Sequence, residues 1–211
     1  MPIRVLICDD HGVVAEGLRY LVQAQPDMEV VALVNDGREA VHRTMQDRPD
    51  VVLMDIAMPI LNGTEAARMI CEHCPATRVI MLSTYSDPVH VSRALQIGAM
   101  GYVAKKSVAR EVVDAIRAAR AGRRYLSAQF AGLIDQHASA QDDPLLRLSS
   151  RERQVLQMLA EGHSVIKISE KLLLSPKTIE TYRSRMMEKL GISNIATLVK
   201  FAIQQGVTHL E

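Results

Sequence analysis

Short apolar runs alternate with helical patterns over the first 121 residues of the chain. Each run has the length of a strand, and in each following segment apolar residues recur at helical spacing. The predicted strands are Ile3–Cys8, Glu29–Val34, Val51–Met54, Val79–Leu82 and Gly101–Ala104. The predicted helices are Val13–Ala24, Arg38–Asp47, Thr64–Cys74, Val89–Ile97 and Ala109–Ala121. Continuously apolar strands that alternate with helices predict a doubly wound α/β domain with a parallel five-stranded sheet.

The pattern changes after Gly122. A weaker helical signal covers Ser127–His137, and the small polar stretch that follows it is typical of a linker. Beyond this stretch, four short helices are predicted to end at Glu161, Leu173, Leu190 and Gln205, with N-caps at Ser149, Ser164, Ser175 and Ser193. The chain is therefore expected to hold a sheet domain over residues 1–121, a partly helical linker over 122–145 and an all-α four-helix domain over 146–211.

Charge differs between the two predicted domains. Residues 1–144 carry 15 Lys and Arg against 18 Asp and Glu, whereas residues 145–211 carry 10 against 6. A basic C-terminal domain favours a polyanion as partner, although a solvated basic surface has the same composition. Three cysteines are too few for a disulfide scaffold, and no apolar stretch approaches the roughly 18 residues of a membrane span. We expect a cytoplasmic protein without a membrane partner.

Charged side chains stand at the ends of three predicted strands. Asp9 and Asp10 follow the first strand, Asp55 the third and Lys105 the fifth. Because the carboxyl ends of parallel strands share one edge, where ligands bind, we expect the four charges to converge there. Carboxylates suit a hard cation such as Mg²⁺, and a lysine suits a phosphoryl oxygen. The pattern predicts a cation site beside a carboxylate that accepts phosphate.

Each of these residues also has an ordinary alternative role. Asp9 and Asp10 precede a helix and would suit its N-cap, and Lys105 would be unremarkable on a surface. A hydroxyl that binds another phosphoryl oxygen is predicted at the end of the fourth strand, from Ser83 or Thr84. All of these residues lie at the carboxyl ends of predicted strands, and this coincidence favours the cation and phosphate site over the separate ordinary roles.

The first half of the chain resembles the receiver domain of two-component response regulators, over residues 1 to about 121. The matching elements are Cys8-Asp9-Asp10-His11, Leu53-Met54-Asp55-Ile56-Ala57-Met58-Pro59-Ile60-Leu61-Asn62-Gly63, Leu82-Ser83-Thr84-Tyr85 and Gly98-Ala99-Met100-Gly101-Tyr102-Val103-Ala104-Lys105-Lys106. This resemblance implies a flavodoxin-like fold. It also implies that Asp55 accepts phosphate from a sensor histidine kinase.

The resemblance also assigns the remaining residues of the site. It implies Mg²⁺ held directly by Asp10 and Asp55, through water by Asp9, and by the backbone carbonyl of Ala57. Lys105 would bind the phosphoryl group. Ser83 and Tyr102 would form the switch, in which the hydroxyl moves onto the phosphoryl group and the ring follows inward.

The residue two positions after Asp55 argues against an enzyme. Haloacid-dehalogenase-like phosphohydrolases also form an aspartyl phosphate, but they need a second aspartate at this position as general acid, and here it is Ala57. A dinucleotide-binding fold is disfavoured because acidic residues replace the Gly-rich turn after the first strand. Without a side chain at Ala57 to orient water, we expect weak self-dephosphorylation.

The C-terminal helices contain a helix-turn-helix candidate, whose second helix begins after Ser175 with a proline at its first position. The segment from Leu148 to Gly191 resembles the LuxR-type helix-turn-helix, and the resemblance covers nearly all of residues 146–209. The whole chain thereby resembles the NarL/FixJ class of response regulators. Two departures from the usual pattern are Val165-Ile166-Lys167 at the start of the second helix and Tyr182 in place of histidine.

The resemblance makes Pro176–Leu190 the recognition helix in the major groove of double-stranded DNA. The candidates for base edges are Glu180, Thr181 and Ser184, and those for phosphates are Lys177, Thr178, Arg183 and Arg185. The class uses the fourth helix to form a homodimer on phosphorylation, here through Ile195, Leu198, Val199 and Ala202, although a core role is equally compatible with part of this stripe. RNA polymerase is a further candidate partner. The competing interpretation is a signalling module whose C-terminal helices dock onto a protein.

Overall fold

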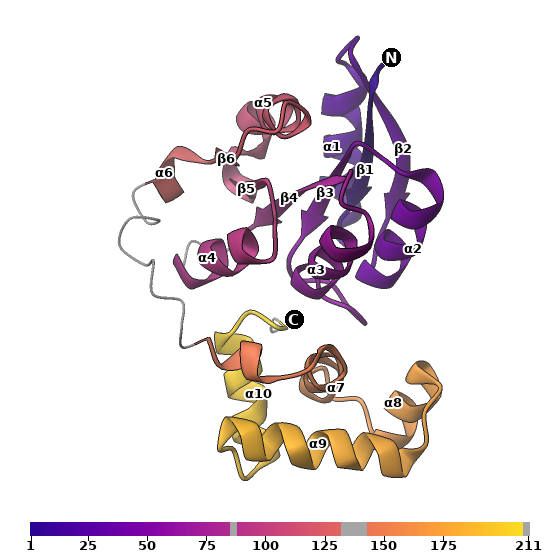
Figure 1. Cartoon of the computed structure of the whole chain (residues 1–211), viewed down its shortest axis with the longest axis vertical. Helices are drawn as coiled ribbons and strands as arrows, with labels where there is room; N and C mark the ends of the chain where they lie inside the picture. Colours follow the sequence, from indigo (N-terminus) through magenta and orange to yellow (C-terminus); the bar gives the residue numbers. More distant parts are fainter. Residues whose placement is uncertain (85–87, 132–142, 209–211) are drawn as a thin grey trace. The chain divides into compact units, whose positions relative to one another are not determined.

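The computed structural model describes residues 1–84, 88–131 and 143–208 (Figure 1). By its internal contacts the chain divides into two compact units, Met1–Ala140 and Gln141–Glu211. Part of the helix predicted over Ser127–His137 is present as α6 (Ala128–Ala131). The rest of that helix lies outside the described residues, as does most of the polar stretch predicted as a linker.

A parallel sheet forms the centre of the N-terminal unit, with strand order β2-β1-β3-β4-β5-β6 (Figure 1). The strands are β1 (Ile3–Cys8), β2 (Met28–Val34), β3 (Val51–Asp55), β4 (Arg78–Ser83), β5 (Gly101–Ala104) and β6 (Tyr125–Leu126). The first five lie where the apolar runs predict them. The prediction of five strands is wrong by one, because β6 has two residues and no apolar run of its own. Pairing with β5 defines it, with Gly101 beside Tyr125 and Tyr102 beside Leu126.

Helices cover both faces of this sheet. One face packs on α1 (Gly12–Gln23) and α5 (Val108–Arg120), and the other on α2 (Gly37–Asp47), α3 (Gly63–His73) and α4 (Pro88–Gln96) (Figure 1). Successive strand residues point to opposite faces, so Val5 and Ile7 enter one core while Leu6 and Cys8 enter the other. Strands buried on both faces explain why the sequence shows continuous apolar runs.

The C-terminal unit is helical throughout its described part. It contains the 3₁₀ turn η3 (Pro144–Arg147) and the helices α7 (Ser150–Ala160), α8 (Val165–Leu172), α9 (Pro176–Leu190) and α10 (Ile195–Gln204). Three of the four predicted N-caps are confirmed. Ser149 forms the capping box with Glu152, and the side chains of Ser164 and Ser175 accept backbone hydrogen bonds at the starts of α8 and α9.

The fourth predicted cap is wrong by one residue. Asn194, not Ser193, caps α10, and its Oδ1 accepts a hydrogen bond of 2.9 Å from the backbone N–H of Thr197. Both residue types suit an N-cap, so sequence alone does not separate two adjacent candidates.

No helix in the described part of the chain is both long enough and apolar enough to cross a membrane.

Candidate functional site

The structure brings together the charges at the ends of the strands. Asp55 is the last residue of β3, Asp9 and Asp10 follow β1 directly, and Lys105 follows β5. The Nζ atom of Lys105 lies 2.9 Å from Oδ2 of Asp9 and 2.8 Å from Oδ2 of Asp55. One ammonium therefore bridges two carboxylates that are far apart in the sequence.

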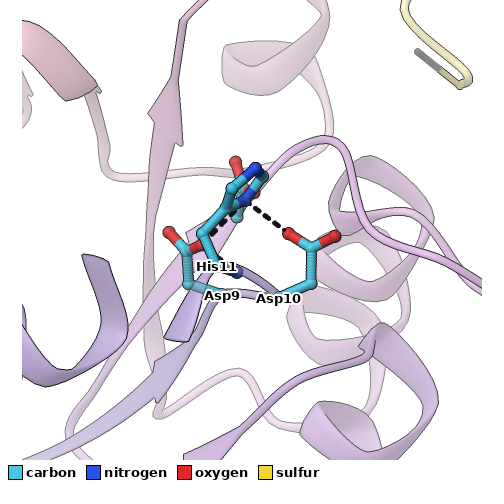
Figure 2. A group of neighbouring side chains, drawn as sticks. Asp9, Asp10 and His11 are labelled. Atoms are coloured by element: carbon cyan, nitrogen blue, oxygen red, sulfur yellow. Dashed lines mark hydrogen bonds and ion pairs between the residues drawn. The ribbon is translucent and has the colours of Figure 1, made fainter. Parts of the chain in front are cut away.

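Asp10 and His11 complete the acidic cluster. Nδ1 of His11 lies 2.8 Å from Oδ1 of Asp10 and 3.4 Å from Oδ1 of Asp9, so the imidazole reaches both carboxylates (Figure 2). His11 occupies the N-cap position of α1, although its side chain makes no capping bond. The alternative that Asp9 and Asp10 cap this helix is therefore not what the structure shows. Oδ1 of Asp9 instead accepts the backbone N–H of His11 at 2.9 Å.

Burial shapes the electrostatics of the cluster. It is the main reason that the pKa of Asp55 is raised to about 6, while the Lys105 ammonium opposes the rise and the Asp9 carboxylate adds to it. Burial also acts against the charged form of Lys105. The two carboxylates that it contacts outweigh that effect and raise the pKa of its ammonium. Lys105 therefore stays protonated, and its single positive charge is outnumbered by the carboxylates of Asp9, Asp10 and Asp55.

The chemistry of the cluster fits a cation. Asp9, Asp10, His11 and Asp55 each offer a ligand atom, and these atoms lie within 4.8 Å of one another. Oδ2 of Asp9, Oδ1 of Asp10 and Oδ2 of Asp55 are buried oxygens that receive no hydrogen bond in the described structure and make only their ion pairs. Oxygen donors of this kind suit Mg²⁺, whereas the imidazole of His11 is a softer ligand.

The loop after β3 fixes the position of the Asp55 carboxylate. Oδ1 of Asp55 accepts the backbone N–H of Ile56 at 2.8 Å. The loop then returns to the strand, because the N–H of Gly63 donates to the carbonyl of Ile56 at 2.8 Å. A Cβ at Gly63 would overlap the carbonyl oxygen of Asp55, so this approach requires glycine. The half-buried Ala57 lies within this loop.

The two predicted switch residues belong to adjacent strands. Ser83 is the last residue of β4 and lies opposite Ala104 of β5, the residue before Lys105. Its side chain is buried, whereas Thr84 is exposed, so Ser83 is the better placed of the two hydroxyl candidates. Tyr102 of β5 is completely buried, with its ring in the core on the α3 and α4 side.

In the C-terminal unit, α9 has one buried and one exposed side. Ile179 and Met186 are completely buried, and Tyr182 and Leu190 pack against the same core. The residues of α9 that are exposed include Lys177, Glu180, Thr181, Ser184 and Arg185. This spacing of three and four residues places them along one stripe of the helix surface. The predicted recognition helix therefore presents a polar stripe.

Some of the predicted DNA contacts already have partners within the helix. The hydroxyl of Thr181 donates to the carbonyl of Lys177 at 2.9 Å, and the hydroxyl of Thr178 lies 2.8 Å from that of Ser175 at the cap. Glu180 forms an ion pair of 3.5 Å with the half-buried Arg183. Lys177, Ser184 and Arg185 are the predicted contacts whose side chains make no such bond among those described.

A buried carboxylate ties the end of α9 to the start of α7. Oε2 of Glu152 lies 2.7 Å from Nζ of Lys189 and accepts the backbone N–H of Ser149 at 2.7 Å. Burial alone would raise the pKa of Glu152, but the hydrogen bonds from Lys189 and Ser149 outweigh it and lower the pKa. The contact fixes α9 relative to α7 and was not anticipated from the sequence.

The predicted dimer stripe on α10 divides between core and surface. Leu198 and Ala202 are completely buried in the core of the C-terminal unit, so neither has surface to offer a partner in this fold. Their assignment as dimer contacts is corrected to a core role. Ile195 is 42% exposed and Val199 is partly exposed, and these two remain the candidates.

Comparison with known families accounts for both units. The chain matches the response regulator receiver domain over residues 5–117 and the luxR family of bacterial regulatory proteins over residues 146–202. The chain belongs to the response regulators. It combines a receiver domain with a LuxR-type helix-turn-helix, the domain arrangement of the NarL/FixJ class, and is thus a two-component transcription regulator of the DNA-binding type.

Relatives match this response regulator over almost their whole length. It is 36% identical to the response regulator UvrY of Escherichia coli over 212 residues, covering 99% of this chain and 97% of that protein. It is 37% identical to the response regulator GacA of Pseudomonas aeruginosa over 208 residues, covering 97% of each. Among solved structures, the RcsB response regulator of Salmonella typhimurium matches with a TM-score of 0.60 and 26% identity, covering 95% of this chain and 97% of that one.

A structure of RcsB in complex with DNA matches with a TM-score of 0.60 at 26% identity, covering 95% of this response regulator and 98% of that chain. The fold of the whole chain is therefore one found in a DNA-bound response regulator.

Proposed function

We propose that this response regulator is switched by phosphorylation of Asp55 and that the switch controls its dimerisation and its binding to specific DNA sequences. The observation that carries the proposal is the shared ammonium of Lys105, 2.8 Å from Asp55 and 2.9 Å from Asp9. A buried carboxylate with a cation at its oxygen is suited to carry a phosphoryl group, because the added negative charge meets an existing positive one.

In the proposed reaction, a carboxylate oxygen of Asp55 attacks the phosphorus of a phosphohistidine on the sensor kinase. The O–P bond forms as the P–N bond breaks, and the kinase imidazole leaves with the electron pair of that bond. Asp55 must be ionised to attack, which its pKa of about 6 permits at neutral pH. Lys105 then binds one oxygen of the acyl phosphate, and Ser83 donates to another.

Mg²⁺ is the cation that we expect in the cluster, held directly by Asp10 and Asp55, through water by Asp9, and by the carbonyl of Ala57. When bound, it would supply the positive charge that a phosphoryl group among three carboxylates requires. The buried oxygens of Asp9, Asp10 and Asp55 that receive no hydrogen bond support this assignment.

The side chain of Ala57 bears on how long the signal lasts. A methyl group two residues after Asp55 can neither accept a proton from water nor orient it, so the acyl phosphate should hydrolyse slowly. We therefore propose that the chain stores a signal and is no phosphatase of its own. Substitution of Ala57 by Asp or Glu should shorten the lifetime of the phosphorylated protein.

For DNA, we propose that α9 lies in the major groove, with Lys177 and Arg185 on phosphates and Ser184 at a base edge. Two copies bound to adjacent half-sites would gain affinity together, so dimerisation through Ile195 and Val199 would turn phosphorylation into a change of DNA occupancy. The exposure of these side chains supports the assignment.

The test begins with random double-stranded DNA, from which sequences are enriched on the protein treated with acetyl phosphate and Mg²⁺. Footprinting on the enriched sequence should give salt-sensitive protection, about tenfold stronger with acetyl phosphate than without it. Asp55→Asn should bind without this increase and should take up no acid-labile phosphate. Absence of sequence-selective protection under both conditions would contradict the DNA-binding function and favour the protein-docking interpretation.

A further inference from the structure

The short segment formed by β6 and α6, Tyr125–Ala131, lies beyond the part of the chain that matches the receiver family, yet it is built into the receiver sheet. The backbone N–H of Tyr125 donates to the carbonyl of Met100 at 2.9 Å, and that of Ser127 donates to the carbonyl of Tyr102 at 3.1 Å. Two ladder bonds thus attach this β6–α6 segment to the strand that carries Tyr102.

The hydroxyl of Ser127 joins this segment to the edge of the site. Ser127 is buried, and its Oγ accepts the backbone N–H of Ala104 at 3.2 Å while donating to the carboxylate of Glu111 on α5. Ala104 is the residue before Lys105 and lies opposite Ser83. The hydroxyl therefore holds the end of β5, which positions both the phosphate-binding lysine and the strand beside the switch serine.

The ring of Phe130 covers the switch tyrosine. Its centroid lies 5.0 Å from that of Tyr102, and the two rings meet edge to face at 87°. Phe130 is 1% exposed and Tyr102 is completely buried, in the same core. Phe130 comes from α6, whose last residue, Ala131, is followed by the chain that leads to the DNA-binding unit. The inward tyrosine therefore packs against α6, the last described element before the chain that leads to the C-terminal unit.

We propose that Ser127 and Phe130 are positioning residues that link the switch tyrosine to the connection between the two units. Phe130 packs as described only on an inward Tyr102, so the docked segment and the inward ring stabilise each other. The inward position of the Tyr102 ring and the docking of the β6–α6 segment are thus two coupled equilibria, and such coupling is reciprocal. A phosphoryl group that favours the inward ring must therefore also favour docking of the segment. This inference rests on the proposed function, because it takes phosphorylation of Asp55 as the signal.

The test uses the full chain with Mg²⁺ and beryllium fluoride, which mimics the phosphoryl group on an aspartate. Hydrogen exchange is followed at the amides of Tyr125 and Ser127, and binding of beryllium fluoride is followed separately by calorimetry. We expect the protection of both amides against exchange to rise about tenfold when beryllium fluoride binds. This is the factor by which an interaction as strong as an aromatic pair would lower the population of the open segment. Phe130→Ala should still bind beryllium fluoride but lose this rise.

Two further variants separate positioning from general damage to the fold. Ser127→Thr keeps a hydroxyl and should retain the response that Ser127→Ala loses. Gln129→Ala removes an exposed neighbour on α6 and should behave as the unsubstituted protein does. In the enriched-DNA assay, Phe130→Ala and Ser127→Ala should also lose the tenfold effect of acetyl phosphate while they still take up phosphate.

The inference is overturned if Phe130→Ala and Ser127→Ala keep the full rise in protection, or if Gln129→Ala loses it to the same extent. A protein that binds beryllium fluoride with no change at Tyr125 and Ser127 also contradicts the inference and leaves the proposed function standing. Failure of the unsubstituted protein to bind beryllium fluoride contradicts the proposed function, and the inference falls with it.

Discussion

The two units place their functional side chains in opposite ways. In the N-terminal unit Asp9, Asp55 and Lys105 are brought together from three strands and are mostly buried, with the side chain of Lys105 only 12% exposed. In the C-terminal unit the predicted DNA contacts are neighbours on α9 and are largely exposed. A buried cluster depends on the whole fold and feeds back on its stability, whereas an exposed stripe depends on one helix. Substitutions on the exposed stripe of α9 should therefore change function without changing stability. Substitutions in the buried cluster of the N-terminal unit should change both.

The largest effect should come from Lys105→Met. Removing the ammonium leaves buried carboxylates without their partner, and loss of one member of a buried ion pair costs about 3 kcal/mol of the free energy of unfolding. Chemical denaturation in EDTA at pH 8 measures this loss for the N-terminal unit. Added Mg²⁺ should recover part of it, because the cation replaces the missing positive charge.

The neighbouring Lys106 is exposed, so Lys106→Met is the matched control and should unfold as the unsubstituted protein does. If Lys105→Met unfolded with the same free energy as the unsubstituted protein, and Mg²⁺ did not change that value, the ion pairs of Lys105 would not stabilise the N-terminal unit.

Arg185→Ala should change function without changing stability. Loss of one phosphate contact should weaken binding to the enriched DNA by about tenfold, and the slope of log affinity against log salt should fall by about 1. Unfolding should stay within about 0.5 kcal/mol of the unsubstituted protein, since the side chain is exposed. Lys200→Ala on α10 removes another exposed basic side chain and serves as the control. An equal loss of affinity in both variants would mean that α9 has no special role.

Glu152 is the exception that sharpens the comparison, because it is a buried charge in the C-terminal unit. Its pKa is lowered from the ordinary value of 4.5, so the folded state binds this proton less readily than the unfolded state does. The stabilisation is present above pH 4.5 and disappears as the pH falls through the lower folded value. Glu152→Gln should cost about 1 kcal/mol at pH 7 and flatten the pH dependence below 4.5.

Thermal unfolding of the C-terminal unit between pH 3 and 7 measures this effect, with Glu188→Gln on the exposed side of α9 as the control. A Glu152→Gln curve parallel to that of the unsubstituted protein would show that the contact with Lys189 does not stabilise the fold.

The smallest effect should come from the cap of α10. Asn194→Ala removes the side-chain acceptor for the N–H of Thr197 and should lower the free energy of unfolding by about 0.5–1 kcal/mol. Ser193→Ala should change it by less than about 0.3 kcal/mol, because Ser193 is exposed and lies before the cap. Chemical denaturation of both variants measures their free energies of unfolding, and of these two adjacent residues only Asn194 is expected to stabilise α10. The reverse order of effects would restore the prediction made from the sequence.

Much of the site could be predicted from the sequence because its signals are local. Asp9, Asp55 and Lys105 each follow an apolar run, and the geometry of parallel sheets then brings them together. The caps at Ser149, Ser164 and Ser175 are local for the same reason, since each needs only an acceptor a few residues before its donor.

What could not be predicted depends on contacts between distant residues. β6 exists because Tyr125 and Leu126 pair with Gly101 and Tyr102, and two residues are too few to show a strand pattern of their own. Phe130 stands in a weak helical pattern, with no local feature that assigns it to Tyr102. Leu198 and Ala202 share the apolar stripe of α10 with Ile195, and only the packing of α10 into the core separates buried positions from exposed ones.

The ion pair between Asp55 and Lys105 also has a consequence during synthesis of the protein. Lys105 follows Asp55 by about 50 residues, so at about 5–20 residues per second the ribosome adds it some 3–10 s later. Until β5 has emerged and paired with β4, Asp55 lacks the cation at its oxygen and the hydroxyl of Ser83 lacks its neighbouring strand. Under the proposed function, we therefore expect chains that lack β5 to be unable to respond to phosphorylation of Asp55.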